Sequence, residues 1–298
     1  RGMAVLPEQI IVGAGTEYLY GLLIQLLGNE KIYAVENPGY RKIGKIYQSY
    51  KVLCKYIDMD EEGVEISKLE ENQVDIAHIS PSHHYPTGIV MPVSRRYELL
   101  GWAAKSENRY IIEDDYDSEL RLSGQPIPTL QSMDVSDKVI YMNTFTKTLA
   151  STVRISYMIL PRELFQQYYK KLSFYSCTVS NFEQYTLARF MESGSFEKHI
   201  NRLRNYYQNK RDAILEIFKT APLDQYITIK EEDSGVHFMM KLKTDRTEMD
   251  MISDAKSKGI KLAPLSKYFV DQTSNMNFQN VYVMNYSSID LEQLPLIF

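Results

Sequence analysis

The chain has 298 residues, of which 44% are hydrophobic and 24% are charged. These values are typical of a soluble globular protein, and the length allows a large domain together with a smaller one. Only two cysteines occur, which excludes a disulfide framework and a cysteine-rich zinc site. The formal net charge of −4 provides no general attraction for nucleic acid.

The sequence contains no apolar run long enough to cross a bilayer and no recognisable targeting segment. We therefore expect a cytoplasmic protein with no membrane partner. The first residues, Arg1-Gly2-Met3, read as the interior of a domain. For this reason we also expect that a further part of the protein precedes them.

Residues 1–160 alternate short apolar runs with amphipathic stretches. Period-2 alternation or continuous apolar character predicts strands, whereas a 3.6-residue period predicts helices. Strands that alternate with helices favour crossover connections, a mainly parallel sheet and the α/β class. The predicted strands are 9–13, 31–35, 51–57, 76–79, 110–113, 139–142 and 155–160, and the predicted helices are 17–27, 44–50 and 95–107.

The pattern changes after Pro161. Residues 163–177 and a long region at 183–219 have helical periodicity, and 226–243 reads as two strands around a turn. A helix at 249–258 and a strand at 281–286 complete the chain. We predict a large domain at residues 1–180, followed at 181–298 by a long connecting helix and a small C-terminal α+β domain.

The most informative motif is TFTKTL at residues 144–149, followed by Arg154. A lysine flanked by hydroxyl groups after a buried strand suits a cofactor that carries both an aldehyde and a phosphate. The Lys147 amine would form an imine, while Thr144, Thr146 and the guanidinium would hold phosphate oxygens. Taken alone, Lys147 could equally be a solvated lysine at the start of a helix.

An acidic motif, EDDYD at residues 113–117, closes an earlier predicted strand. A carboxylate here could keep a cofactor ring nitrogen protonated, and the tyrosine hydroxyl could hold a ring oxygen. The alternatives are a solvated strand end or a metal site. A metal site would require further histidine or carboxylate ligands, and none cluster in the sequence, so we expect no metal.

A third motif, GAGTE at residues 13–17, lies at a strand-to-helix junction. Its glycines would let the backbone approach an anion at the N–H groups that begin the helix. The spacing is neither that of a Rossmann fold nor that of a P-loop, which disfavours nucleotide binding.

In this order, the motifs resemble fold-type I enzymes of the aminotransferase class I/II group, which use pyridoxal 5′-phosphate (PLP). Two segments, SPSHHYPTG at 80–88 and EDDYDSEL at 113–120, are similar to the MocR subfamily of GntR-type regulators. The resemblance implies a fold-type I PLP-dependent transferase fold with a three-layer large domain. It also implies a regulator in which a winged-helix DNA-binding domain precedes an aminotransferase-like domain that senses PLP or an amine.

The resemblance gives each matching residue a role. Lys147 corresponds to the catalytic Schiff-base lysine, Asp114 to the partner of the pyridine nitrogen and Tyr116 to the phenol near the ring oxygen O3′. Tyr40 corresponds to an aromatic residue beside the ring, although a core tyrosine is an alternative. His84 either contacts PLP or packs in the interior. The remaining candidates would hold the phosphate: Gly15, Thr16, Glu17, Thr144, Thr146 and Arg154.

Two departures from the enzymes bear on function. Aminotransferases have an asparagine where this chain has Tyr85, and an arginine that binds the substrate carboxylate where it has Val283. No arginine follows Arg246. Without an ion pair between an arginine and the substrate carboxylate, transamination of ordinary amino acids is not expected, unless Lys42 or Lys261 replaces the arginine.

Three hypotheses follow. In the first, the domain senses PLP, or an amine or amino-acid effector that replaces Lys147 on the cofactor, and it controls attached DNA-binding domains outside this chain. In the second, the chain is an active class I/II aminotransferase. In the third, it is an interaction module without cofactor. The present PLP contacts disfavour the third, and Tyr85 and Val283 favour the first. The resemblance also implies a homodimer.

Overall fold

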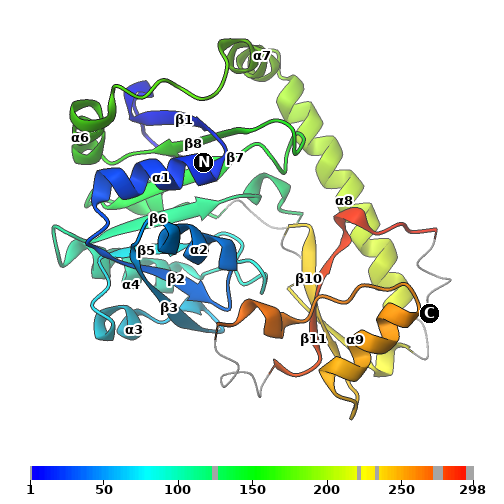
Figure 1. Ribbon diagram of the computed structural model, residues 1–298. Helices are drawn as coiled ribbons and strands as arrows, with labels where there is room; N and C mark the ends of the chain where they lie inside the picture. Colours follow the sequence, from blue (N-terminus) through cyan, green and yellow to red (C-terminus); the bar gives the residue numbers. More distant parts are fainter. Residues whose placement is uncertain (1, 123–126, 220–222, 232–234, 271–277, 293–298) are drawn as a thin grey trace.

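The computed structural model describes residues 2–122, 127–219, 223–231, 235–270 and 278–292 (Figure 1). Its larger sheet comprises β1 (Ile10–Ala14), β2 (Ile32–Asn37), β3 (Leu53–Asp60), β4 (Gly63–Val64), β5 (Ile76–Ile79), β6 (Tyr110–Asp115), β7 (Val139–Thr144) and β8 (Ile155–Ile159). The strand order is β1-β8-β7-β6-β5-β2-β3-β4. Strands β3, β2, β5, β6 and β7 run parallel, whereas β8 is antiparallel to both of its neighbours. The predicted α/β fold is therefore confirmed.

Helices cover both faces of this sheet. Successive strand residues face opposite sides, so Ile112 and Ile140 join one apolar core while Ile111 and Val139 join the other. The first core is shared with α1 (Thr16–Leu27), α2 (Arg41–Ser49) and α6 (Arg162–Leu172). The second is shared with α3 (Ile66–Glu71), α4 (Val93–Ala104) and α5 (Leu130–Met133). This is the three-layer arrangement that was predicted.

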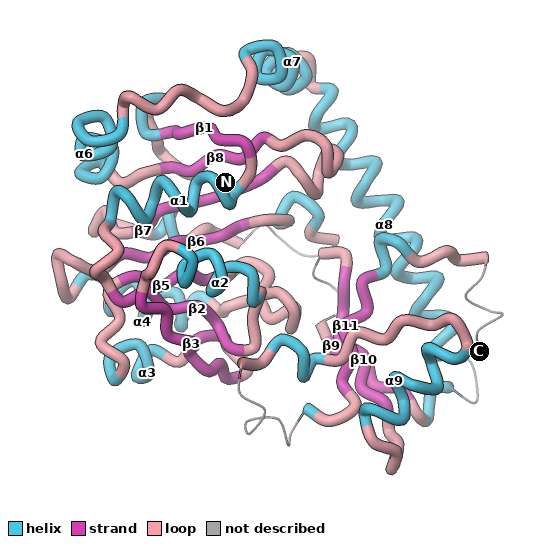
Figure 2. The backbone as a smooth tube through the Cα atoms, viewed as in Figure 1, coloured by secondary structure: helices cyan, strands magenta, loops and turns pink. Residues whose placement is uncertain are grey.

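A second, antiparallel sheet contains β9 (Ile227–Lys230), β10 (His237–Leu242) and β11 (Val281–Asn285), in the order β11-β10-β9. One face packs on α8 (Ser195–Lys219), and α9 (Glu248–Ser257) lies beside the sheet (Figure 2). The opposite face carries Met239 and Val283, which pack with Leu265 and against Tyr85 of the larger unit. The boundary at residue 180 stays a prediction.

The prediction of one long helical region at 183–219 was wrong in one respect. The segment forms two helices, α7 (Asn181–Glu192) and α8, with Gly194 between them at φ 68°. Glycine adopts this left-handed conformation without a Cβ penalty, so it ends α7 although the apolar periodicity continues. The predicted helix at 163–177 likewise ends earlier, at Leu172. Within the described ranges, no helix combines the length and apolar character needed to cross a membrane.

We predict that Leu23→Ala will lower the free energy of unfolding by about 2–5 kcal/mol, because Leu23 of α1 is fully buried against the sheet. Val135→Ala is the control, since Val135 is 99% exposed, and it should change stability by less than about 0.5 kcal/mol. Urea unfolding followed by circular dichroism measures both. Equal effects would contradict the packing of α1.

Candidate functional site

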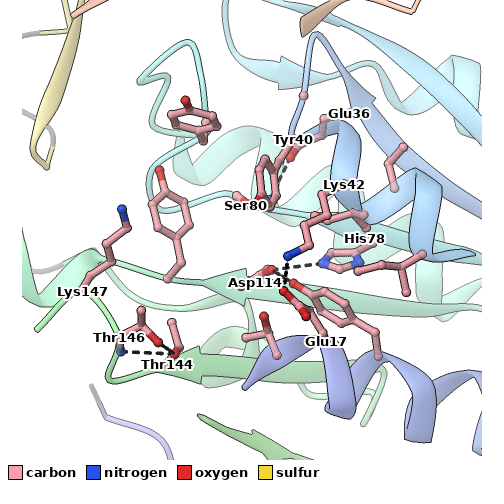
Figure 3. A pocket seen from close by; sticks show the side chains of 18 of the residues that line it. Glu17, Glu36, Tyr40, Lys42, His78, Ser80, Asp114, Thr144, Thr146 and Lys147 are labelled. Carbon is pink, nitrogen blue, oxygen red and sulfur yellow. Dashed lines mark hydrogen bonds and ion pairs between the residues drawn. The ribbon is translucent and has the colours of Figure 1, made fainter. Parts of the chain in front are cut away.

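A pocket of about 400 Å³ lies where the parallel strands β2, β5, β6 and β7 end, beside the start of α1 (Figure 3). Ligand sites in open α/β sheets form at such carboxyl ends. Most of the residues singled out in the sequence line it: Thr16, Glu17, Tyr40, Asp114, Tyr116, Thr144, Thr146, Lys147 and Arg154. Gly15 lies behind Arg154, and His84 does not line the pocket.

The Asp114 carboxylate, near the end of β6, is only half satisfied by the protein. Its Oδ2 accepts a hydrogen bond from the Tyr20 hydroxyl at 2.5 Å and lies 3.3 Å from His78 Nε2. Its Oδ1 is buried and has no hydrogen-bond partner among the described residues. Buried carboxylate oxygens are almost always paired, so Oδ1 can accept a hydrogen bond from a donor inside the pocket.

Tyr20 and His78 are site residues that the sequence reasoning missed. His78 is 2% exposed, and its Nδ1 lies 2.6 Å from the Tyr47 hydroxyl. Burial, followed by the neighbouring Asp114, raises the pKa of Tyr20 well above its ordinary value. Tyr20 therefore remains a hydroxyl donor, and together the two side chains fix the orientation of the carboxylate.

At the other end of the pocket, hydroxyl groups and a guanidinium gather beside the first turn of α1. Thr144 and Thr146 have their Oγ1 atoms 2.9 Å apart, and Ser156 Oγ donates to Thr144 Oγ1 at 2.9 Å. Gly15, at φ 91°, precedes α1 with no side-chain cap, and a Cβ there would overlap the Arg154 guanidinium. A positive group and unpaired helix N–H groups are a suitable site for an anion.

Lys147 lies in the turn after β7 and is exposed. Its amine makes no hydrogen bond or ion pair with any residue that the structure describes, although it lines the same pocket as Asp114. By contrast, Lys42 forms an ion pair with Glu17 at the mouth of the pocket (Figure 3). Of the two lysines that line the pocket, Lys147 is thus the one whose amine has no partner among the described residues.

The position expected for the carboxylate-binding arginine is apolar. Val283 is 5% exposed and packs with Met239, Leu265 and Phe269 behind Tyr85. Tyr85 is held by a 2.7 Å hydrogen bond between its hydroxyl and that of Tyr268. A cation in this cluster would be expensive to bury without a partner.

The two other cations proposed for that role differ in position. Lys42 lines the pocket but is paired with Glu17, whereas Lys261 is exposed and does not line it.

His84 lies behind the pocket wall. Its Nδ1 is 2.7 Å from Thr87 Oγ1, and its Nε2 is 3.5 Å from Glu36 Oε2. Because the ring is buried and does not line the pocket, the geometry favours the packing alternative for this residue.

Sequence and structure comparisons agree on the family. The sequence profile described as "Aminotransferase class I and II" matches residues 2–289. The chain belongs to this family. It is 40% identical over 266 residues to the uncharacterized HTH-type transcriptional regulator YdeL of Bacillus subtilis, and 28% identical over 291 residues to the probable rhizopine catabolism regulatory protein MocR of Rhizobium meliloti. The resemblance to MocR-type regulators inferred from the motifs is confirmed.

These matches cover 89% and 97% of this chain but only 57% and 58% of the two regulators. Among solved structures, kynurenine aminotransferase of Pyrococcus horikoshii, in complex with PMP, has a TM-score of 0.79 and 26% sequence identity. That match covers 95% of this chain and 71% of the enzyme.

The buried carboxyl of Glu36 in β2 gives a pH-dependent prediction. Burial raises its pKa to about 8, and only its Oε2 accepts a hydrogen bond, from the Ser80 N–H at 3.0 Å. Between pH 4.5 and 8, the Glu36 carboxyl ionises in the unfolded state while it keeps its proton in the folded state, so the contribution of this group to stability falls as the pH rises. The decline is about 1.4 kcal/mol per pH unit.

Glu36→Gln should flatten this decline, because glutamine stays neutral. Urea unfolding at pH 5, 6, 7 and 8 measures it, with Glu61→Gln at an exposed position as control. An unchanged slope in Glu36→Gln would show that this carboxyl is ionised in the folded protein.

Proposed function

We propose that this chain is the effector-sensing, aminotransferase-like part of a transcriptional regulator and that it holds PLP in the pocket at Lys147. The observation that carries the sensor assignment is the apolar cluster around Val283, beside a pocket that keeps the polar groups a PLP site needs. The regulators YdeL and MocR, which match almost the whole chain, support the same assignment.

The residues present fit the cofactor. The unpaired Asp114 Oδ1 suits the ring N–H, while Arg154, the hydroxyls of Thr144 and Thr146 and the start of α1 suit the phosphate. Tyr116 also lines the pocket, and its hydroxyl, which lies 3.3 Å from His83 Nδ1, would donate a hydrogen bond to the ring oxygen. PLP supplies an aldehyde that reacts with amines and a ring that withdraws electrons.

Within this proposal, Lys147 has two tasks. Its amine would hold the cofactor aldehyde covalently, with loss of water. It would become free again when the amine of an effector takes its place on the cofactor. Because the tyrosine-lined wall near Val283 offers no guanidinium, recognition would rely on the amine and on aromatic contacts with Tyr40 and Tyr85.

The remaining parts of the proposal concern the longer protein. DNA binding would belong to a winged-helix domain outside this chain, as the name "HTH-type" of the relative YdeL suggests. A homodimer, cytoplasmic location and the domain boundary at residue 180 are further parts of the same hypothesis.

Active transamination is the second candidate, favoured by the likeness to kynurenine aminotransferase. A released Lys147 amine could move protons on a bound substrate. Against this stands Val283, because the ion pair that orients a substrate carboxylate is a main source of affinity and alignment.

For cofactor attachment, we predict that PLP will produce the visible absorbance of a lysine-bound cofactor in the native protein and not in Lys147→Ala. Lys261→Ala is the matched control, since Lys261 is exposed and outside the pocket. Persistence of the band in Lys147→Ala would refute the assignment of Lys147.

For the phosphate end, Gly15→Ala should weaken PLP binding by at least about tenfold, because the new methyl overlaps the Arg154 guanidinium and strains the backbone at φ 91°. Gly101→Ala provides the control: Gly101 lies in α4, and its added Cβ would meet nothing within 4 Å. Equilibrium titration of PLP compares them. Equal affinities would contradict the anion site at α1.

For turnover, we expect the PLP-loaded chain to convert common pairs of amino acid and keto acid far more slowly than the roughly 1–1000 s⁻¹ of typical enzymes. Coupled assays that follow the keto-acid product measure this rate. Rapid turnover would favour the second candidate while leaving the cofactor assignment intact.

A further inference from the structure

Three buried side chains meet outside the pocket, and none of them has a task in the proposed function. His83 follows β5, Asp117 follows β6 and His237 begins β10. Their exposed fractions are 4%, 1% and 2%. One donor atom from each lies within 4.8 Å of those from the other two. The sequence did not predict this group, because its members are far apart along the chain.

The hydrogen bonds within the group leave two nitrogen atoms unused. His83 Nδ1 lies 2.9 and 2.8 Å from the two Asp117 carboxylate oxygens. The rings of His83 and His237 are 4.4 Å apart between centroids. Both Nε2 atoms are buried and have no hydrogen-bond partner among the described residues. A buried unpaired nitrogen is unfavourable. His83 would meet an ion through Nδ1, the atom that faces Asp117, and the unpaired Nε2 of His237 can complete the group.

We propose that His83, Asp117 and His237 bind a divalent transition-metal ion, with Zn²⁺ as the first candidate. Two imidazoles and a carboxylate form a common ligand set for zinc and for other first-row metals, whereas Mg²⁺ and Ca²⁺ prefer oxygen ligands. The negative Asp117 also offsets part of the charge of a buried cation.

At this location, a bound ion would link two parts of the structure. His237 belongs to the smaller sheet, whereas His83 and Asp117 lie on loops of the larger one. Asp117 directly follows Tyr116 of the pocket, and the Tyr116 and His83 rings stack at 5.9 Å. A bound ion would therefore tie the smaller sheet to the pocket wall.

The test uses the chain without an affinity tag, stripped with a chelator and then dialysed against Zn²⁺ or Co²⁺. We expect one ion per chain by elemental analysis, and a Co²⁺ ligand-field absorbance that Zn²⁺ abolishes by competition. His237→Gln and Asp117→Asn should each lower the affinity at least about 100-fold. His199→Gln is the matched control, because His199 is only partly buried and contacts the Thr148 carbonyl, so it should bind like the native chain.

Absence of stoichiometric binding by the native chain would overturn the proposal, whatever the variants do. Undiminished affinity in His237→Gln would also overturn it. If circular dichroism shows that a variant does not fold, an anomalous difference map from a Co²⁺-soaked crystal of the native chain is the alternative test. An ion among these three residues supports the proposal, and an ion elsewhere or none overturns it. None of these measurements requires PLP.

Discussion

The Asp114 carboxylate is the constraint on which the rest of the site depends. A buried charge in a sheet is unfavourable unless its lone pairs are occupied. Here the Tyr20 hydroxyl and His78 hold one oxygen, while the other has no partner among the described residues. A ligand that donates a hydrogen bond to this oxygen would complete the arrangement, and the ring N–H of the proposed cofactor is such a donor.

The fold makes this arrangement possible by bringing parallel strands to an end together. Strands β5, β6 and β7 pair in parallel, so His78, Asp114 and Thr144 lie at one edge of the sheet although they are distant in sequence. Helix α1 packs on one face of this sheet through its buried side chains, and its first turn, which has no side-chain cap, lines the pocket. The two ends of the pocket are thereby positioned by the hydrophobic core.

In the proposed function, the difference between a sensor and an enzyme lies in the apolar cluster of the smaller sheet, beside the pocket. Val283 and Met239 place an apolar cluster where an arginine would bind a carboxylate. Capture of an amine by the proposed cofactor requires only the groups that hold that cofactor. Efficient transamination also requires a substrate held in the correct orientation. The same chain can therefore belong to the aminotransferase class I and II family and still serve regulation.

The sequence predicted the strands of the larger sheet well, because their alternation and apolar runs report burial directly. It also predicted many of the residues that line the pocket, since the motifs of the family retain their order along the chain, but His84 lies behind the pocket wall. Tyr20 and His78 were missed because, within apolar segments, a buried polar residue looks like part of the core. The break at Gly194 was missed because the helical periodicity continues on both sides of it. The cluster of His83, Asp117 and His237 was missed because it depends on tertiary contacts between the two sheets.

The account is tested most directly by reducing the PLP-loaded native chain with borohydride and mapping the modified peptide by mass spectrometry. Reduction makes the bond between cofactor and lysine permanent, so the label records which amine was attached. We predict one cofactor-derived label per chain, on Lys147. A label on Lys42 or on scattered surface lysines, or no label at all, would contradict the account.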